Sequence, residues 1–152
     1  MITSETGLVD ANVLVYAINE NAEHHTVALK FIESGLNGEI PISFTPQVFS
    51  EFFATVTNPK RITSVLSRED AVSEIENYFL KGEGDIVFIH QGTLDKMIEL
   101  IKKYHVNAQD IFDLQIVATM LSNNITRIYT YNEKDFSRYN EIEVLNPESV
   151  IQ

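Results

Sequence analysis

Four carboxylates in the sequence lie among apolar residues, where an ion has few favourable partners. Asp10 directly follows a short apolar run, Glu51 lies within VFSEFFATV, and Asp113 lies within IFDLQIVATML. Asp135 follows in TYNEKDF, near the end of the chain. A buried carboxylate is costly unless it is paired. If these side chains met, a hard divalent cation such as Mg²⁺ or Mn²⁺ would offset their repulsion, because such ions prefer oxygen ligands.

Each acid also has a plainer interpretation. Asp110, three residues before Asp113, could cap a helix or interact with its dipole instead of binding a ligand. Asp135 could cap the segment that follows it, Asp10 could be a structural turn residue, and Glu51 could lie on a solvated helix face. A shared metal site therefore depends on whether the fold brings the carboxylates together.

Short apolar segments alternate with segments of helical periodicity along the whole chain. Strands are predicted at residues 7–9, 40–44, 85–89, 126–131 and 142–145. Helices are predicted at residues 12–18, 22–36, 46–58, 67–80, 94–105 and 109–122. This alternation is typical of a mostly parallel sheet covered on both faces. With 152 residues and no linker or repeat, the chain is predicted to be one α/β domain over residues 1–152.

Two local details of these helices are also predicted. Asn12 is expected to cap the first helix. The apolar stripe in the helix at 94–105 is expected to face the core; it consists of Leu94, Met97, Ile98 and Ile101.

The predicted topology brings the acids to one edge of the sheet. In open α/β sheets, ligands bind beyond the carboxyl ends of the strands. Asp10 follows the first strand there, and Asn132 and Asp135 follow the strand at 126–131. Glu51 and Asp113 lie on helices that start from the same side. We therefore expect these five side chains to converge.

Several other chemistries are excluded by the sequence. There is no Cys, and so no disulfide, thiolate metal site or Cys nucleophile. No glycine-rich phosphate loop or G-x-S-x-G motif occurs, and the adjacent His24 and His25 lack the spacing of a zinc pair. No signal peptide or membrane-length apolar run is present, which favours a cytoplasmic protein without membrane contact. The net charge of −11 argues against a bulk electrostatic attraction to nucleic acid.

Taken together, the motifs resemble those of PIN-domain ribonucleases, particularly VapC-type toxins of prokaryotic toxin–antitoxin pairs. The motifs are LVDANVLVYA, TPQVFSEFFATVTNP, DIFDLQIVATML and IYTYNEKDF, in that order, followed by a closing VLNP. Asp10, Glu51 and Asp113 fall on the first three acidic positions of the family. Many relatives have Asp where this chain has Asn132, so either Asn132 or Asp135 is the fourth member. Asp110 could compensate for a missing charge.

The resemblance implies a PIN-like three-layer α/β/α fold and Mg²⁺- or Mn²⁺-dependent cleavage of RNA. One or two ions would be held mainly by Asp10 and Asp113. A water activated at the metal would attack phosphorus in line, with Glu51 or Asp135 orienting or deprotonating it. The products would be a 5′-phosphate and a 3′-hydroxyl. The family also implies an RNA substrate, a small antitoxin partner that enters an acidic groove, and a homodimer.

Two further readings of the acidic cluster are open. The chain could be a catalytically degenerate PIN-fold module that binds RNA or protein, for which Asn132 is the main support. A phosphoacceptor domain would need a suitably placed Lys, and no convincing set is present. For a nuclease, four cations could line the approach of RNA: Lys60, Arg61, Lys134 and Arg138. So few cations predict weak binding with a shallow salt dependence.

Overall fold

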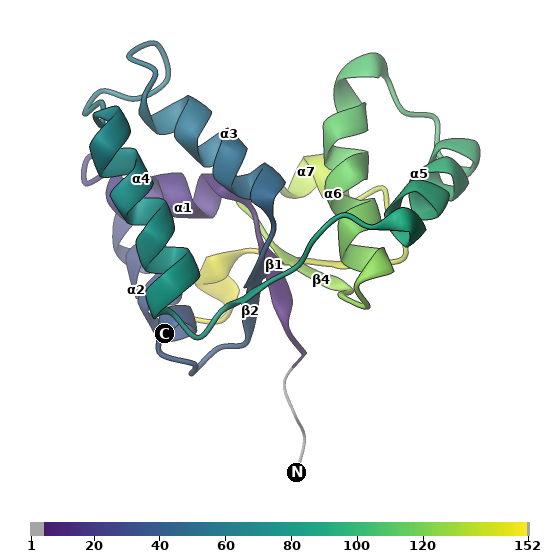
Figure 1. Ribbon diagram of the computed structural model, residues 1–152, viewed down its shortest axis with the longest axis horizontal. Helices are drawn as coiled ribbons and strands as arrows, with labels where there is room; N and C mark the ends of the chain where they lie inside the picture. The colour runs from purple at the N-terminus through teal and green to yellow at the C-terminus, as the bar shows by residue number, and fades with distance from the viewer. Residues whose placement is uncertain (1–4, 152) are drawn as a thin grey trace.

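A five-stranded sheet, with every strand parallel to its neighbours, forms the centre of the protein. The computed structural model describes residues 5–151, and the strands run in the order β3-β2-β1-β4-β5 (Figure 1). Their bounds are β1 (Gly7–Val9), β2 (Ile42–Phe44), β3 (Asp85–Ile86), β4 (Arg127–Tyr129) and β5 (Glu143–Leu145). All five lie within the predicted segments; β1 has the predicted bounds, and β2 to β5 are shorter than predicted. The expected α/β class with a parallel sheet is therefore confirmed.

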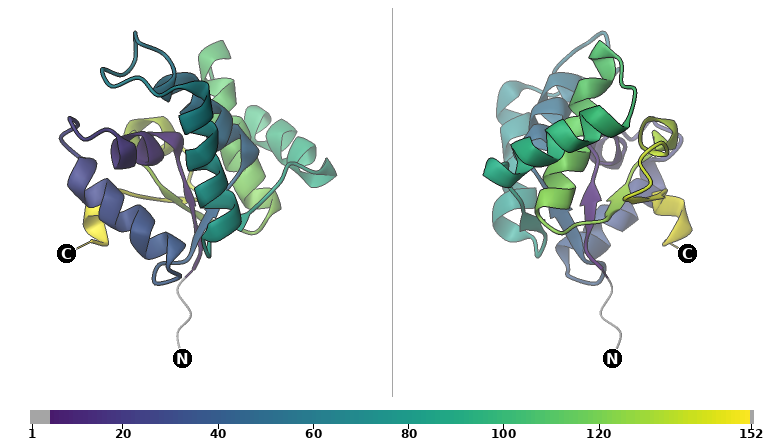
Figure 2. Two further views of the ribbon diagram at one scale, coloured as in Figure 1. Left: turned by 60° about the vertical axis from the view of Figure 1, so that its left-hand side comes forward. Right: turned by 90° about the vertical axis from the view of Figure 1, so that its right-hand side faces the viewer.

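Seven α-helices are found in the described part of the chain. They are α1 (Ala11–Ile18), α2 (His25–Leu36), α3 (Pro46–Val56), α4 (Arg68–Glu76), α5 (Gln91–Lys103), α6 (Ile111–Ser122) and α7 (Glu133–Phe136). Helices α1 to α4 lie on one side of the sheet and α5 and α6 on the other, which gives the three layers (Figure 1 and Figure 2). None of the helices in this part is long and apolar enough to cross a membrane.

Strand β1 occupies the middle of the sheet and is completely buried. Leu8 pairs with Ser43 of β2 on one side and with Ile128 of β4 on the other. Because helices cover both faces, β1 carries apolar residues in succession instead of alternating apolar and polar ones. The strand ends at Val9, so the next residue, Asp10, emerges at the carboxyl edge of the sheet.

The start of α1 differs from the prediction. Asp10, and not Asn12, caps the helix, because Oδ1 of Asp10 accepts a hydrogen bond from the backbone N–H of Ala11 at 2.8 Å. The side chain of Asn12 is directed across the sheet edge instead. Its Oδ1 accepts a hydrogen bond from the backbone N–H of Tyr131 at 3.1 Å. Asn12 therefore ties α1 to the residues that follow β4.

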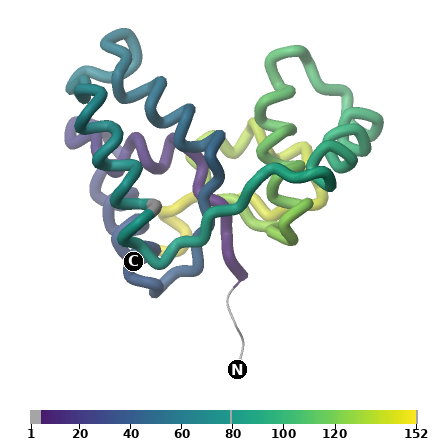
Figure 3. Tube along the Cα trace, viewed as in Figure 1, coloured from purple at the N-terminus to yellow at the C-terminus, as the bar shows by residue number. Residues whose placement is uncertain are grey.

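The apolar stripe of α5 was expected in the core, and this expectation is wrong for three of its four residues, since only Met97 is half-buried against the core. Leu94, Ile98 and Ile101 are 58%, 45% and 45% exposed, while Leu100 on the opposite face is buried. α5 packs on α6 through that opposite face, which leaves the stripe uncovered. The chain reaches α5 from α4 through a π-helical turn (Asn77–Lys81) and β3, crossing the whole width of the molecule (Figure 3).

Candidate active site

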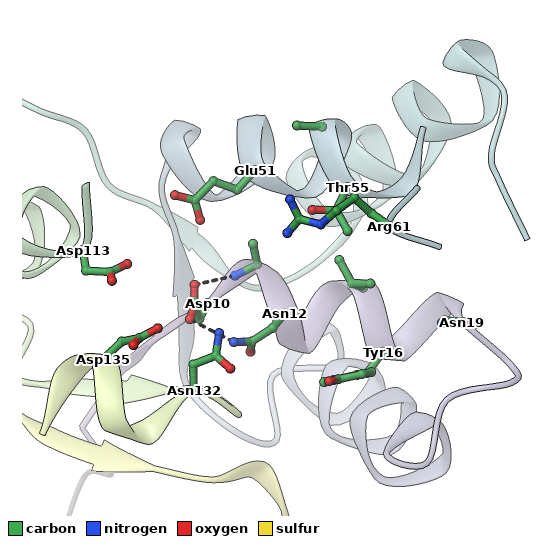
Figure 4. Close-up of a pocket in the computed structure, with 13 residues that line it drawn as sticks. Asp10, Asn12, Tyr16, Asn19, Glu51, Thr55, Arg61, Asp113, Asn132 and Asp135 are labelled. Atoms are coloured by element: carbon green, nitrogen blue, oxygen red, sulfur yellow. Dashed lines mark hydrogen bonds between the residues drawn. The ribbon is translucent and has the colours of Figure 1, made fainter. Parts of the chain in front are cut away.

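A pocket of about 450 Å³ lies at the carboxyl edge of the sheet. Four carboxylates line it, each delivered by a different segment: Asp10 from the end of β1, Glu51 from α3, Asp113 from α6 and Asp135 from α7. Their carboxyl groups point towards a common space (Figure 4). The structure therefore brings together the four acids that the sequence singled out as catalytic.

Asp10 lies at the bottom of the pocket and is held by three donors. Besides the N–H of Ala11 on Oδ1, Oδ2 accepts hydrogen bonds from the hydroxyl of Thr130 at 2.8 Å and the amide of Asn12 at 3.2 Å. The Thr130 hydroxyl also accepts from the backbone N–H of Asn132 at 3.0 Å. This network fixes the plane of a carboxylate that is only 6% exposed.

Glu51 lies on the opposite wall and is positioned by Gln47, one turn earlier on α3. The side-chain amide of Gln47 donates to Oε1 of Glu51 at 3.2 Å and to the carbonyl oxygen of Phe112 at 2.9 Å. Phe112 directly precedes Asp113 on α6. One amide therefore connects the two helices that carry Glu51 and Asp113.

The pKa values of three of these acids are raised. Burial raises the pKa of Asp10, with a further contribution from the charge of Asp135, and its hydrogen bonds oppose this rise. Burial also raises the pKa of Glu51, with a smaller contribution from Asp10. The pKa of Asp113 rises from 3.8 to about 7, first through burial and then through the charges of Asp135, Asp10, Glu51 and Asp110. The cluster thus lacks a compensating positive charge.

Asn132 and Asp135 both line the pocket. Asp135 is the largest electrostatic contributor to the raised pKa of Asp113 and also raises the pKa of Asp10. Its charge therefore acts on two other acids of the pocket. Asn132 contributes a neutral amide at the base of the same wall (Figure 4).

Asp110 is absent from the pocket lining. Its Oδ2 accepts a hydrogen bond from the backbone N–H of Asn107 at 3.2 Å and forms an ion pair with Arg138 at 3.2 Å. These contacts match the capping interpretation and make a direct role as a metal ligand unnecessary.

The donor set suits a hard divalent ion, because it consists of carboxylate and amide oxygens with no counter-charge among the acids. Within residues 5–151, however, no three His, Asp or Glu side chains are close enough to be identified as a metal cluster. The carboxylates surround a shared space, but among residues 5–151 they are not close enough to one another to form a coordination shell. The residues present therefore fit a metal in their chemistry and in their common orientation.

Two polar residues of the site were missed by the sequence reasoning. Thr130 was treated as part of a strand, although a polar residue at the end of a buried strand, two residues before Asn132, is a signal for a site. Gln47 lies four residues before Glu51, and this spacing places two side chains on one helix face. The sequence alone does not show that Thr130 contacts Asp10, or that Gln47 also contacts Phe112 on α6.

Comparison with known proteins agrees with this architecture. A family model of the PIN domain matches residues 7–142. The ribonuclease VapC37 of Mycobacterium tuberculosis is 23% identical over 144 residues, covering 95% of this chain and 99% of the relative. Ribonuclease VapC43 of the same species is 26% identical over 141 residues, covering 91% and 93%.

Solved structures show the same fold at lower identity. VapBC2 from Rickettsia felis, bound to a DNA fragment from its promoter, has a TM-score of 0.62 at 19% identity and covers 93% of this chain and 98% of the matched chain. M. tuberculosis VapC20, a sarcin–ricin loop cleaving toxin, has a TM-score of 0.63 at 12% identity and covers 90% and 98%. The family model spans most of the chain and all of its strands except β5. The chain therefore belongs to the PIN domain family.

Proposed function

We propose that this protein is a metal-dependent endoribonuclease and the VapC-type toxin of a toxin–antitoxin pair, acting in the cytoplasm. The observation that carries this proposal is the convergence of Asp10, Glu51, Asp113 and Asp135 on one pocket at the carboxyl edge of the sheet. The curated relatives are named ribonucleases, which supports RNA as the substrate.

Asp10 and Asp113 would hold a Mg²⁺ or Mn²⁺ ion, with Asp135, Glu51 and Asn132 as further oxygen donors. A bound ion would supply Lewis-acid activation of water and neutralise charge on the scissile phosphate. Thr130 and Asn12 orient the carboxylate of Asp10 for this task.

Glu51 is suited to accept the proton of the attacking water. Burial raises its pKa, which makes the carboxylate a stronger base, and Gln47 fixes its position on the wall of the pocket. Asp135 is the better candidate for the fourth acidic position than Asn132, since its charge acts on both Asp10 and Asp113. Asn132 would then contribute at most its neutral amide oxygen.

A small antitoxin is the proposed protein partner. Several structural neighbours are VapBC complexes, from Rickettsia felis, Haemophilus influenzae and Salmonella typhimurium. The acidic pocket of this chain would accept a basic side chain from such a partner. Insertion of that side chain would neutralise the carboxylates and block access of RNA.

A homodimer is proposed as the functional unit. The exposed apolar stripe of α5 supports it, because Leu94, Ile98 and Ile101 lie on one helix face. Burial of these side chains against a second copy would stabilise the dimer. The ends of the stripe are separated by about two helical turns, so a second copy of α5 could cover it with a helix of equal length.

The test of the catalytic proposal is cleavage of single-stranded RNA by the purified protein without antitoxin. We expect cleavage with Mg²⁺ or Mn²⁺, no cleavage in EDTA, and a loss of at least a hundredfold in Asp10→Asn. Asp95→Asn, which removes an exposed acid from α5, is the matched control and should keep wild-type activity. Calorimetry should detect Mn²⁺ binding to wild type and to Asp95→Asn, and none to Asp10→Asn. Undiminished metal affinity and cleavage in Asp10→Asn would refute the proposal.

A further inference from the structure

The two ends of the pocket differ in charge. The carboxylates of Asp10, Asp113 and Asp135 gather at one end, while Tyr16, Asn19, Thr55 and Arg61 line the other (Figure 4). Arg61 is the only basic side chain among the described residues that line the pocket. In Figure 4 its guanidinium extends from the loop after α3 towards the interior. The pocket therefore has a direction, from an acidic end to a basic end.

Arg61 is not used in the ion pairs that hold the surface together. No ion pair within 4.0 Å involves it among residues 5–151, although Glu51 lines the same pocket. Arg138, in contrast, is bound to Asp110 at 3.2 Å and to the carbonyl oxygen of His105 at 3.4 Å. Lys60, next to Arg61, is exposed and does not line the pocket.

The backbone below Arg61 is held in place. The carbonyl oxygen of Asn58 accepts hydrogen bonds from the N–H groups of Arg61 at 2.9 Å and Ile62 at 3.2 Å, and the side chain of Ile62 is buried. The N–H of Lys60 donates to the side-chain oxygen of Asn58 at 2.9 Å. Because this turn is anchored to the core, little backbone freedom is lost when Arg61 binds a ligand.

We propose that Arg61 binds the phosphate of the nucleotide next to the scissile one in single-stranded RNA, and so places the scissile phosphate at the carboxylates. The proposal rests on the ribonuclease function proposed above. The planar guanidinium matches two phosphate oxygens, and phosphates repeat along RNA, so a strand with one phosphate at the acidic end presents another beyond it. In a protein of net charge −11, the basic side chain of the pocket would determine the direction in which the RNA strand enters it.

The first test compares Arg61→Ala with Lys60→Ala, which removes the adjacent cation outside the pocket. With an RNA oligonucleotide and Mg²⁺, Arg61→Ala should raise KM about tenfold and leave kcat within about twofold. The slope of log affinity against log salt should fall by about 0.7, the value for one phosphate contact on a single strand. Lys60→Ala should change neither KM nor the slope. Arg61→Lys should lie between wild type and Arg61→Ala, because it keeps the charge and loses the fork.

The second test removes the charge from the RNA. In a series of oligonucleotides, one phosphate flanking the cleavage site at a time is replaced by a neutral methylphosphonate. The nucleotide that precedes it carries a 2′-O-methyl group for stability. At one flanking position, wild type should lose about tenfold in kcat/KM and Arg61→Ala should lose nothing further. The fully charged oligonucleotide carrying the same 2′-O-methyl group is the reference.

The outcomes separate this inference from the proposed function. If wild type cleaves RNA and Arg61→Ala behaves like Lys60→Ala, the inference is wrong and the ribonuclease stands. If Arg61→Ala lowers kcat at unchanged KM, or loses as much as wild type from every methylphosphonate, Arg61 acts on the carboxylates and not on RNA. If wild type cleaves no RNA with either metal, both proposals fail. Equal thermal unfolding of the variants establishes that they are folded.

Discussion

Replacing Asp113 by Asn should stabilise the metal-free protein while abolishing RNA cleavage. The charge of Asp113 lies beside those of Asp135, Asp10 and Glu51, and burial and this repulsion raise its pKa to about 7. When the pKa of a carboxyl group is higher in the folded protein than in the unfolded chain, the ionised form of that group destabilises the fold. The charged form therefore destabilises the fold above pH 7, and the effect fades as the pH falls from about 7 towards 3.8.

The magnitude follows from the rise in pKa. A rise from 3.8 to about 7 corresponds to about 4 kcal/mol at most. Asp113 is half-buried, and solvent screening reduces this to about 1–2 kcal/mol. For a chain of this size, each kcal/mol raises Tm by about 2–4 °C, so Asp113→Asn should unfold about 3–6 °C above wild type.

The assay is thermal unfolding in EDTA at pH 8 and again at pH 5, where the gain should shrink to less than half. Added Mg²⁺ should raise the Tm of wild type more than that of Asp113→Asn. Asp110→Ala is the contrasting variant, since it removes the ion pair with Arg138 and the hydrogen bond from Asn107, and it should unfold below wild type. An Asp113→Asn protein that is no more stable than wild type at pH 8 would show that the carboxylates do not repel one another.

Two further perturbations address the support of Asp10 and the surface of α5. Thr130→Val removes the hydroxyl that donates to Asp10 and accepts from the N–H of Asn132, so metal affinity should fall about 10–100-fold by calorimetry; unchanged affinity would mean that the other donors to Asp10 suffice. Ile98→Asp should convert the proposed dimer to a monomer in sedimentation velocity, whereas Asp95→Asn on the same helix should remain dimeric. A wild type that sediments as a monomer at micromolar concentration would contradict the dimer.

The convergence of the acids could be predicted because it depends on local pattern and general topology. Alternation of strands and helices implies a parallel sheet, and in such a sheet the carboxyl ends share one edge. Asp10 directly follows one strand and Asp135 lies shortly after another, so both are placed at that edge. Glu51 and Asp113 follow because their helices start there.

What could not be predicted depends on contacts between distant residues. Helical spacing identified the stripe of Leu94, Ile98 and Ile101 but did not show which face of α5 would meet α6. The pairing of Asp110 with Arg138 joins residues that the chain separates by 28 positions. Asn12 was a plausible cap by type, yet its amide binds beyond β4 because Asp10 already occupies the capping position.

The pairing of β1 with β4 has a consequence for when the protein can cut RNA. The hydrogen bond between Asp10 and Thr130 spans 120 residues of chain, and the central strand has β4 as one of its two neighbours. A chain still being synthesised lacks this partner until Thr130 has been made, 120 residues after Asp10. The carboxylate that is made first thus waits for one of its donors until β4 has been made, so the ribosome that makes this chain is not exposed to the fully assembled cutting site before then.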